Sequence, residues 1–387
     1  MSVTIGCGLS TGPDPRVAAI EAAAEAGAAL GRSRADLAVV FCSGAHLAAP
    51  EATLEGVHEA LDPVQLAGCG AGGVLAAGRE VEAGTAVAVW AAELGDGAEA
   101  LAFHADAVEG PDGVGVAGLP DMDGATAAIL LPDPYTFPID AALAAMAAGG
   151  AGMPILGGIA SARTAEGAAA LFLGREVKEA GAVGVRLSGV EVLPCVSQGA
   201  APVGPELTVT GVDGHVIHEL AGRPALEALR DAIEGLDMHD RALVAQGLLL
   251  GVVIGPAKPE YGQGDFLVRG LVGADPEAGT VAVGVPVEAG QVVRLHARDA
   301  ASADRDLRDA LGLRREAIGG GAPAGALVFT CNGRGRGMFG VADHDAAALE
   351  DELAGAPAAG FFAAGEIGPV GGEPFLHGFT ATVAIFP

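Results

Sequence analysis

The chain has 387 residues, 51% of them hydrophobic, and a formal net charge of −28 at neutral pH. This length favours two domains, and the apolar fraction is enough to build a sizeable core in each. The charge argues against a nucleic-acid-binding surface, which needs a basic stripe, and against binding to an anionic membrane. A solvated acidic surface that keeps an alanine-rich protein soluble is the interpretation that fits best.

Neither a targeting segment nor a membrane span is expected. The first ten residues lack a basic start, and Gly6 and Gly8 interrupt their apolar run. The longest apolar stretch, residues 242–257, is broken by glycine and proline, so it predicts a buried strand. The five cysteines are odd in number and in no CxxC spacing, which favours reduced thiols over disulfides or a zinc site. We therefore expect a cytoplasmic protein without a metal or cofactor.

An edge strand near residues 3–9 and an alanine-rich helix over residues 16–30 come first in the chain. Residues 37–94 then follow the order strand, helix, strand, glycine turn, strand, strand. Their first strand, residues 37–41, is apolar throughout, as expected of a strand that is covered on both faces. The glycine turn, residues 68–73, is followed by strands instead of a helix, so it does not predict a dinucleotide-binding loop.

The same order of elements returns in residues 127–189, which indicates an internal duplication. Gly174–Val177 repeats the tetrapeptide Gly78–Val81 at the equivalent place. Residues 326–387 form a third, more divergent copy, because Cys331 ends its first strand as a cysteine does in the first copy. The sequence therefore predicts an α/β (α+β) fold built from repeated strand–helix–strand–strand units in mixed sheets.

Between the second and third copies the pattern changes, so a domain boundary is expected there. A proline-rich crossing segment, residues 193–205, is followed by two short strands that end at Leu220. We place the boundary near Ala221, which gives domains 1–221 and 222–387. The second domain is expected to contain helices at 224–236 and 302–313 and strands at 247–254, 265–271, 280–283 and 291–295.

Four segments are the most distinctive of the sequence: Val196–Gly199, Pro202–Pro205, Cys331–Gly335 and Gly365–Pro369. They resemble the FIST domain family, and the resemblance covers nearly the whole chain. The N-terminal part, with its strand ends and glycine turns, is similar to the FIST N-terminal domain, and the remainder to the FIST C-terminal domain. One departure is the pair Ala200 and Ala201, where the family pattern leads us to expect a cysteine and an arginine.

The resemblance implies a small-molecule sensory domain of signal transduction, with an amino acid or a similar polar metabolite as its ligand. It also implies a free-standing bacterial form, which would act on a separate signalling protein. We expect the ligand to bind between the two domains, and we assign no catalytic residue. Two other classes stay open: a thiol- or carboxylate-dependent enzyme acting on a small acid, and a protein-binding scaffold.

The strongest candidate for ligand binding is the Cys331–Arg336 loop. Side chains and free backbone amides gather at strand ends, which is where such sheets bind ligands. Alternate glycines, among them Gly333, let the backbone approach a ligand, and Arg334 or Arg336 could hold a carboxylate in a bidentate grip. Asn332 and the turn amides could orient it. The alternative is a mobile glycine loop with two solvated arginines.

Five other residues join the candidate set. Asp343 precedes a helix and is interpreted as an N-cap or a ligand contact. Glu366, in a glycine turn, could bind an amine or pair with an arginine of the Cys331–Arg336 loop. Cys42, Ser43 and Cys69 lie at a strand end and in the glycine turn of the first copy. Because no base stands at a recognisable spacing, we expect small buried groups or ligand contacts there and no nucleophile.

Overall fold

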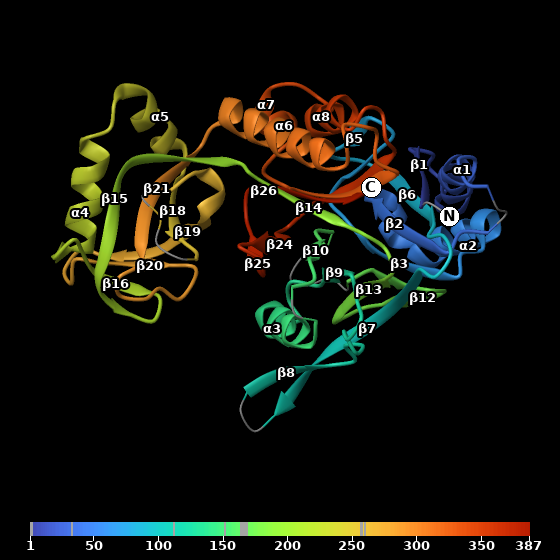
Figure 1. The fold of residues 1–387 in the computed structure, drawn as a ribbon, viewed down its shortest axis with the longest axis horizontal. Coiled ribbons are helices and arrows are strands. Elements are labelled where there is room, and N and C mark those ends of the chain that lie inside the picture. The colour runs from blue at the N-terminus through green and yellow to red at the C-terminus, as the bar shows by residue number, and fades with distance from the viewer. Residues whose placement is uncertain are drawn as a thin grey trace. The chain divides into compact units, whose positions relative to one another are not determined.

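The computed structural model describes residues 3–31, 34–110, 113–150, 152–162, 169–255, 258 and 261–387. The chain forms two compact units (Figure 1): unit 1 comprises Met1–Val196 and Leu307–Pro387, and unit 2 comprises Ser197–Asp306. The chain is an α+β protein of two domains with mixed sheets, which confirms the predicted fold class. The compact units divide the chain differently from the expected boundary near Ala221, because the third copy packs with the first two.

Unit 1 contains one order of elements three times: strand, helix, strand, two-stranded hairpin, strand. The first copy consists of β2 (Leu37–Ser43), α2 (Pro50–Leu61), β3 (Gln65–Gly70), β4 (Val74–Ala76), β5 (Arg79–Val81) and β6 (Ala86–Glu93). The second consists of β9 (Ala127–Pro132), α3 (Ile139–Gly149), β10 (Ile155–Gly158), β11 (Leu171–Leu173), β12 (Glu176–Lys178) and β13 (Ala182–Ser188). The third consists of β22 (Gly325–Cys331), α7 (Arg336–Phe339), α8 (His344–Glu352), β23 (Ala358–Ala363), β24 (Glu366–Val370), β25 (Glu373–His377) and β26 (Thr380–Phe386).

Other elements extend these copies. They are β1 (Thr4–Ser10), α1 (Pro15–Gly27), β7 (Glu99–Gly110), β8 (Gly113–Ala117), β14 (Leu193–Gln198) and α6 (Ala300–Ala317). Along the chain, β14 leads into unit 2 and α6 leads back out of it. As expected, β1 lies at the edge of its sheet.

The three copies exchange their hairpins in a cycle. Sheet 1 has the strand order β1-β6-β2-β3-β11-β12, so the second copy's hairpin extends the first copy. Sheet 2, β25-β24-β10-β9-β13-β7-β8, joins the third copy's hairpin to the second copy, and sheet 3, β14-β26-β22-β23-β4-β5, joins the first copy's hairpin to the third. Every sheet therefore contains strands of two copies, and the copies are interlocked although the third lies at the far end of the sequence.

In each copy the first and second strands run parallel, so their carboxyl ends meet at one edge of the sheet. Cys42 lies opposite Gly70 in sheet 1, and Cys331 lies opposite Ala363 in sheet 3. The closing strand of each copy is antiparallel to the first strand. Both β2 and β22 are buried along their whole length, which explains why their sequences are apolar throughout.

The inner faces of the sheets share one hydrophobic core. The ring centroids of Phe41 and Phe361 are 4.8 Å apart, and those of Trp90 and Phe386 are 5.1 Å apart. Both pairs join the first copy to the third, and such aromatic contacts stabilise beyond the area they bury. Helices cover the outer faces: α1 and α2 lie side by side on sheet 1 (Figure 1), α3 covers sheet 2, and α8 with α6 covers sheet 3.

Unit 2 is a small barrel. Its strands are β15 (Ala200–Asp213), β16 (Val216–Leu220), β17 (Arg223–Pro224), β18 (Leu248–Val253), β19 (Phe266–Asp275), β20 (Thr280–Val283) and β21 (Val292–Arg298). They follow the order β15-β21-β18-β19-β20-β16-β17, and β15 also pairs with β16, which closes the sheet on itself. Helix α4 (Ala225–Glu234) buries Ala228 and Leu229 against the barrel, and α5 (Met238–Gln246) follows it.

Two features differ from the sequence-based expectations. The β7–β8 hairpin was not predicted. Its strands carry apolar side chains at exposed positions, such as Val108 and Val114. The stretch 242–257 is not one strand, because its first part ends helix α5, and β18 begins only after Gly247. Asp237 starts α5 by accepting a hydrogen bond from the backbone amide of Asp240 at 2.8 Å, a capping signal that the apolar run concealed. Residues 256 and 257 lie outside the described part of the chain.

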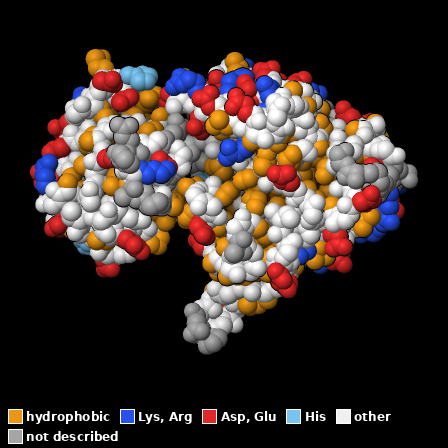
Figure 2. All heavy atoms as spheres, viewed as in Figure 1, with side chains coloured by type: hydrophobic (Ala, Val, Ile, Leu, Met, Phe, Trp, Pro, Cys, Tyr) orange, Lys and Arg blue, Asp and Glu red, His pale blue; other side chains and the backbone are white. Residues whose placement is uncertain are grey.

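The surface carries the excess of acidic groups. In Figure 2, Asp and Glu side chains are scattered over the visible face, and Lys and Arg side chains are fewer. Exposed pairs such as Arg16–Glu59, at 2.5 Å, contribute at most about 1 kcal/mol each. Across the residues that the structure describes, no helix is both long enough and apolar enough to cross a bilayer.

Candidate functional site

The loop after β22 buries an arginine. Arg334 is only 3% exposed, and its Nε and Nη2 donate to Oδ2 and Oδ1 of Asp345 at 2.7 and 2.9 Å. Thr330, one residue before the end of β22, donates its hydroxyl to Asp345 Oδ2 at 2.6 Å. Burial alone would raise the pKa of Asp345, but the Arg334 guanidinium and these donors outweigh it and hold the pKa well below its usual range. The pair is thus fully charged at neutral pH.

Aromatic rings hold the other side of this guanidinium. The Arg334 Cζ atom lies 5.1 Å from the centroid of the Phe339 ring. Phe339 in turn stacks on His344, with ring centroids 3.4 Å apart and planes inclined by 4°. These contacts fix the orientation of Arg334, because a guanidinium over a ring face is attracted by the ring's negative potential.

Glu366 is a second buried ionisable residue at the same place. It begins β24, and its Oε2 accepts hydrogen bonds from the Thr380 amide at 3.0 Å and the Thr380 hydroxyl at 2.8 Å. Burial raises the pKa of Glu366 to about 8, although the Thr380 donors and Arg334 act in the opposite direction. This carboxyl therefore changes its charge near neutral pH.

Cys331 lies beside this carboxyl. Burial, reinforced by the negative charge of Glu366, raises the pKa of the Cys331 thiol to about 12. A thiol with such a pKa is protonated at neutral pH, so it is a weak nucleophile and a polar group of modest strength. The backbone amide of Gly333 lies 3.4 Å from its sulfur.

Cys331, Arg334 and Glu366 thus form one buried cluster, which we call the Cys331 cluster. The charges of Cys331 and Glu366 both act on the pKa of Arg334, and the elements β22 and β24 that carry them are in contact. Two polar atoms of the cluster, Arg334 Nη1 and Glu366 Oε1, have no hydrogen-bond partner among the described residues. Buried polar atoms without partners cost about 1–3 kcal/mol each, so they mark a place where a bound molecule would be stabilised.

Close backbone approach creates the cluster. Glu366 pairs with Gly158 at the end of β10, where sheet 2 meets sheet 3. A Cβ atom on Gly158 would lie 2.9 Å from the Cβ of Ala363 and 3.1 Å from the ring of Phe361. Only glycine leaves room for β24 to bring Glu366 against the carboxyl end of β22.

Parts of all three copies meet at the edge of this cluster. Ser161, just after β10, donates its hydroxyl to the Phe362 carbonyl at 2.5 Å and accepts from the Gly72 amide at 2.9 Å. Asn332 is exposed, and its Oδ1 lies close to Gly72. The sequence analysis did not predict Ser161 as part of the site. Its position shortly after the glycine pair that ends β10 is the feature that could have indicated it.

The chain matches two family domains. The FIST N domain matches residues 36–223, and the FIST C domain matches residues 225–369. The chain belongs to the FIST family. Two uncharacterised mycobacterial proteins are similar to it along their length: one of Mycobacterium tuberculosis is 46% identical over 383 residues, which cover 99% of each chain. The other, of Mycobacterium bovis, is 45% identical over 384 residues, which cover 99% of this chain and 98% of the relative. FIST domains are associated with sensory and signal-transduction roles.

In this FIST protein, Asp343 and Arg336 contact the first copy's hairpin. Asp343 makes no capping hydrogen bond to α8, and its Oδ1 instead accepts from the Glu80 amide at 2.6 Å. Glu80 Oε1 accepts from the Ala346 amide at 2.9 Å and so caps α8 in its place. The side chain of Arg336 is exposed, and its backbone amide donates to Glu82 at 2.8 Å. The exchanged hairpin thus holds both residues.

Cys42, Ser43 and Cys69 of the FIST fold lie in sheet 1, apart from the Cys331 cluster. All three side chains are fully buried, and Ser43 donates its hydroxyl to the Gly84 carbonyl at 2.9 Å. Burial raises the pKa of Cys42 to about 12 and the pKa of Cys69 well above its usual value. These groups therefore pack the strand ends of sheet 1 as neutral side chains.

Within the described residues, no three His, Cys, Asp or Glu side chains are grouped so that they could hold a metal ion.

Proposed function

We propose that this FIST protein is a sensory protein that binds a small polar metabolite with an amine and a carboxylate at the Cys331 cluster. The observation that carries the proposal is a pair of buried polar atoms, Arg334 Nη1 and Glu366 Oε1, that have no hydrogen-bond partner in the described part of the chain. Perturbed ionisable groups that converge from different elements are typical of functional sites. The family's association with sensing small ligands supports the same assignment.

Each residue has a defined role in this proposal. Glu366 Oε1 accepts a hydrogen bond from the ligand's amine, and Arg334 Nη1 donates one to its carboxylate. Asp345 already holds the Nε and Nη2 side of the Arg334 guanidinium, so the ligand's carboxylate binds on the Nη1 side. Asp345 thus fixes the guanidinium, and the exposed Asn332 orients the ligand at the rim.

Ligand binding is coupled to the release of a proton. A cationic amine next to Glu366 stabilises the carboxylate and lowers its pKa from about 8. Binding below that pKa therefore displaces the proton from Glu366. Affinity for the amine rises as the pH increases towards about 8, and a separate signalling protein reads the occupied state.

Thermal shift and calorimetry test this proposal. A panel of amino acids, with the matching amines and acids, is screened for a rise in melting temperature. A ligand at a hundred times its Kd stabilises the folded state by about 2.7 kcal/mol, so the rise should be measurable. Calorimetry of the best ligand in two buffers of different ionisation enthalpy then measures proton release. Glu366→Gln should abolish the response, whereas Glu109→Gln, an exposed change in β7, should leave it intact. A ligand that binds equally well to Glu366→Gln would contradict the proposal.

A second candidate is acid–base chemistry on a small acid, since a carboxyl with a pKa of about 8 can both give and take a proton near neutral pH. A thiol mechanism needs Cys331 to lose a proton to Glu366 despite its pKa of about 12. Thiol labelling of the folded protein separates the two candidates. Rapid labelling of Cys331 that a ligand blocks would favour the enzyme, and labelling only after unfolding favours the sensor.

A further inference from the structure

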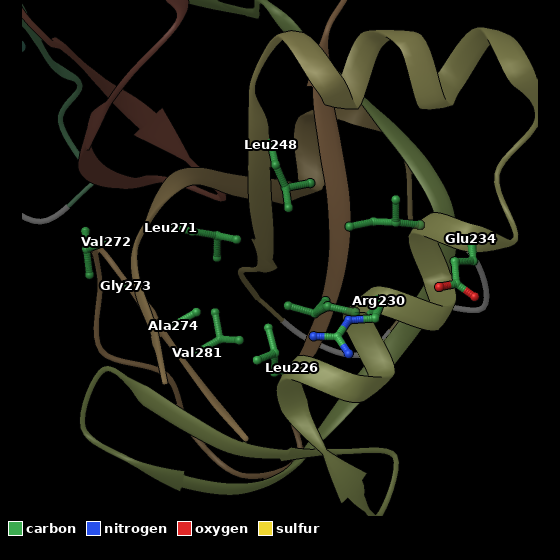
Figure 3. Close-up of a pocket in the computed structure, with 11 residues that line it drawn as sticks. Leu226, Arg230, Glu234, Leu248, Leu271, Val272, Gly273, Ala274 and Val281 are labelled. Atoms are coloured by element: carbon green, nitrogen blue, oxygen red, sulfur yellow. The ribbon is translucent and has the colours of Figure 1, made fainter. Parts of the chain in front are cut away.

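Unit 2 contains a pocket that lies outside the Cys331 cluster. It has a volume of about 490 Å³, within the roughly 300–1,000 Å³ of small-molecule sites. Its walls are largely apolar and come from α4 and from the barrel strands β18, β19 and β20: Leu226, Leu229, Ile233, Leu248, Leu271 and Val281. In Figure 3 the side chains of Leu226, Leu248, Leu271 and Val281 point towards one hollow.

A β-bulge shapes one wall of this pocket. The register between β19 and β20 shifts between Leu271 and Gly273, so Val272 is the extra residue. As a result, the consecutive residues 271–274 all line the pocket, which a regular strand would not allow because its side chains alternate between faces. Val272 is left 65% exposed at the edge of the hollow. Bulges of this kind commonly re-aim side chains towards binding sites.

One cation lies at the pocket. Arg230 of α4 lines it and, among the described residues, makes no hydrogen bond or ion pair. In Figure 3 its guanidinium extends beside Leu226, while the Glu234 carboxylate lies one turn further along α4. By contrast, Arg223 of β17, just before the same helix, is held by Glu227 and Asp231. Arg230 is exposed, so its guanidinium is available to an external anion.

We propose that this pocket binds an amphipathic carboxylate with an unbranched apolar tail, of the fatty-acid type. The tail lies among Leu248, Leu271 and Val281, where it leaves water, and the carboxylate lies at Arg230. Glu234 repels the head group, so the ligand has one orientation. This ligand is separate from the polar metabolite proposed for unit 1, and neither site depends on the other.

Titration calorimetry of the full chain with decanoate, kept below its micelle concentration, tests the pocket. We expect decanoate to bind and its affinity to fall about fourfold for each methylene removed, as the transfer of a methylene predicts. Decylamine should bind much more weakly, because its charge matches that of Arg230. Arg230→Gln should weaken decanoate binding about tenfold and leave decanol binding unchanged. Arg79→Gln is the matched control, because Arg79 of β5 is exposed and has no partner in the described ranges of the chain.

Variants that fill the pocket test whether the apolar tail of the ligand binds there. Ala274→Phe places a ring in the hollow, and Val272→Trp does so from an exposed position that cannot disturb the core. Either variant, with an unchanged melting temperature, should abolish binding of both decanoate and decanol. The proposal is overturned if decanoate does not bind, if the filled variants bind it as the parent does, or if Arg230→Gln leaves its affinity unaltered. None of these outcomes alters the amino-acid response expected at Glu366.

Discussion

Glu80, in the hairpin of the first copy, accepts a hydrogen bond at 2.9 Å from the backbone amide of Ala346, which lies 266 positions later in the first turn of α8. A residue of one copy thus performs the capping that a residue of the third copy was expected to provide. The two copies are held together by this contact as well as by the pairing of β4 with β23.

Glu80→Ala should therefore destabilise unit 1 by about 1 kcal/mol, the usual effect of removing an N-cap. Burial raises the pKa of Glu80 from 4.5 to about 7, so the folded protein favours its neutral form and loses stability as the pH rises from about 4.5 through about 7. Glu80→Gln keeps an acceptor without the charge and should equal the parent at about pH 4 and exceed it at about pH 8. Urea unfolding at both pH values measures this. Equal midpoints for Glu80→Ala and the parent would contradict the capping role.

Asp345→Asn should destabilise the fold by about 3–5 kcal/mol, because it leaves the buried guanidinium of Arg334 without a counter-charge. The double variant Arg334→Met with Asp345→Leu removes both charges and should recover most of that loss. Denaturant unfolding of Arg334→Met, Asp345→Leu and the double variant yields the coupling free energy. Additive effects would mean that the two residues act separately. Because the pKa of Asp345 is depressed, this contribution is present at neutral pH and is lost as the pH falls.

The charge of Glu366 gives the opposite dependence on pH. Its pKa of about 8 lies above the unfolded value, so its contribution is complete at acid pH and is lost as the pH rises from about 4.5 through about 8. We expect the free energy of unfolding to decrease over that range by a few kcal/mol, to order of magnitude. Glu366→Gln should flatten this part of the curve, while Glu109→Gln should not. A parent protein whose stability stays level over that range would count against a buried neutral carboxyl.

Gly158→Ala tests the close approach that creates the Cys331 cluster. The added methyl would lie 2.9 Å from the Ala363 Cβ, closer than two such atoms normally approach, so we expect a loss of about 1–3 kcal/mol. Gly270→Ala is the control, because a Cβ on this β19 glycine meets nothing within 4 Å. Melting temperatures of the two variants provide the comparison. Equal melting temperatures would show that β10 tolerates a wider spacing from β22 and β23.

Much of the fold could be predicted from local patterns. The repeated tetrapeptide at Gly78–Val81 and Gly174–Val177 marks equivalent hairpins in the first two copies, and apolar runs such as residues 37–41 mark the central strands. The exchange of hairpins could not be predicted. Strands of three residues, such as β5 and β12, satisfy their hydrogen bonds equally well on the sheet of their own copy or of another.

The sequence suggested where the candidate site lies better than how its residues pair. A strand end pointed to Cys331 and a glycine turn pointed to Glu366, and the two residues lie in one cluster. The partner of Arg334 was not identifiable, because Asp345 lies in the first turn of a helix, directly after Asp343 and His344, and an acidic residue there reads equally well as part of a helix start. The pocket of unit 2 left no sequence signal, since it depends on the bulge at Val272, and a one-residue register shift cannot be read from apolar spacing.

The circular exchange of hairpins has a consequence for synthesis at the ribosome. The strand β4 pairs with β23, and the edge of β10 pairs with β24. Both edges therefore stay unpaired until the last part of the chain has been synthesised. Nascent chains and truncated products therefore expose unpaired strands, which are prone to aggregate. Loss of any one copy would leave each of the other two with a strand edge that has no partner. The sheets are therefore complete only when all three copies are present.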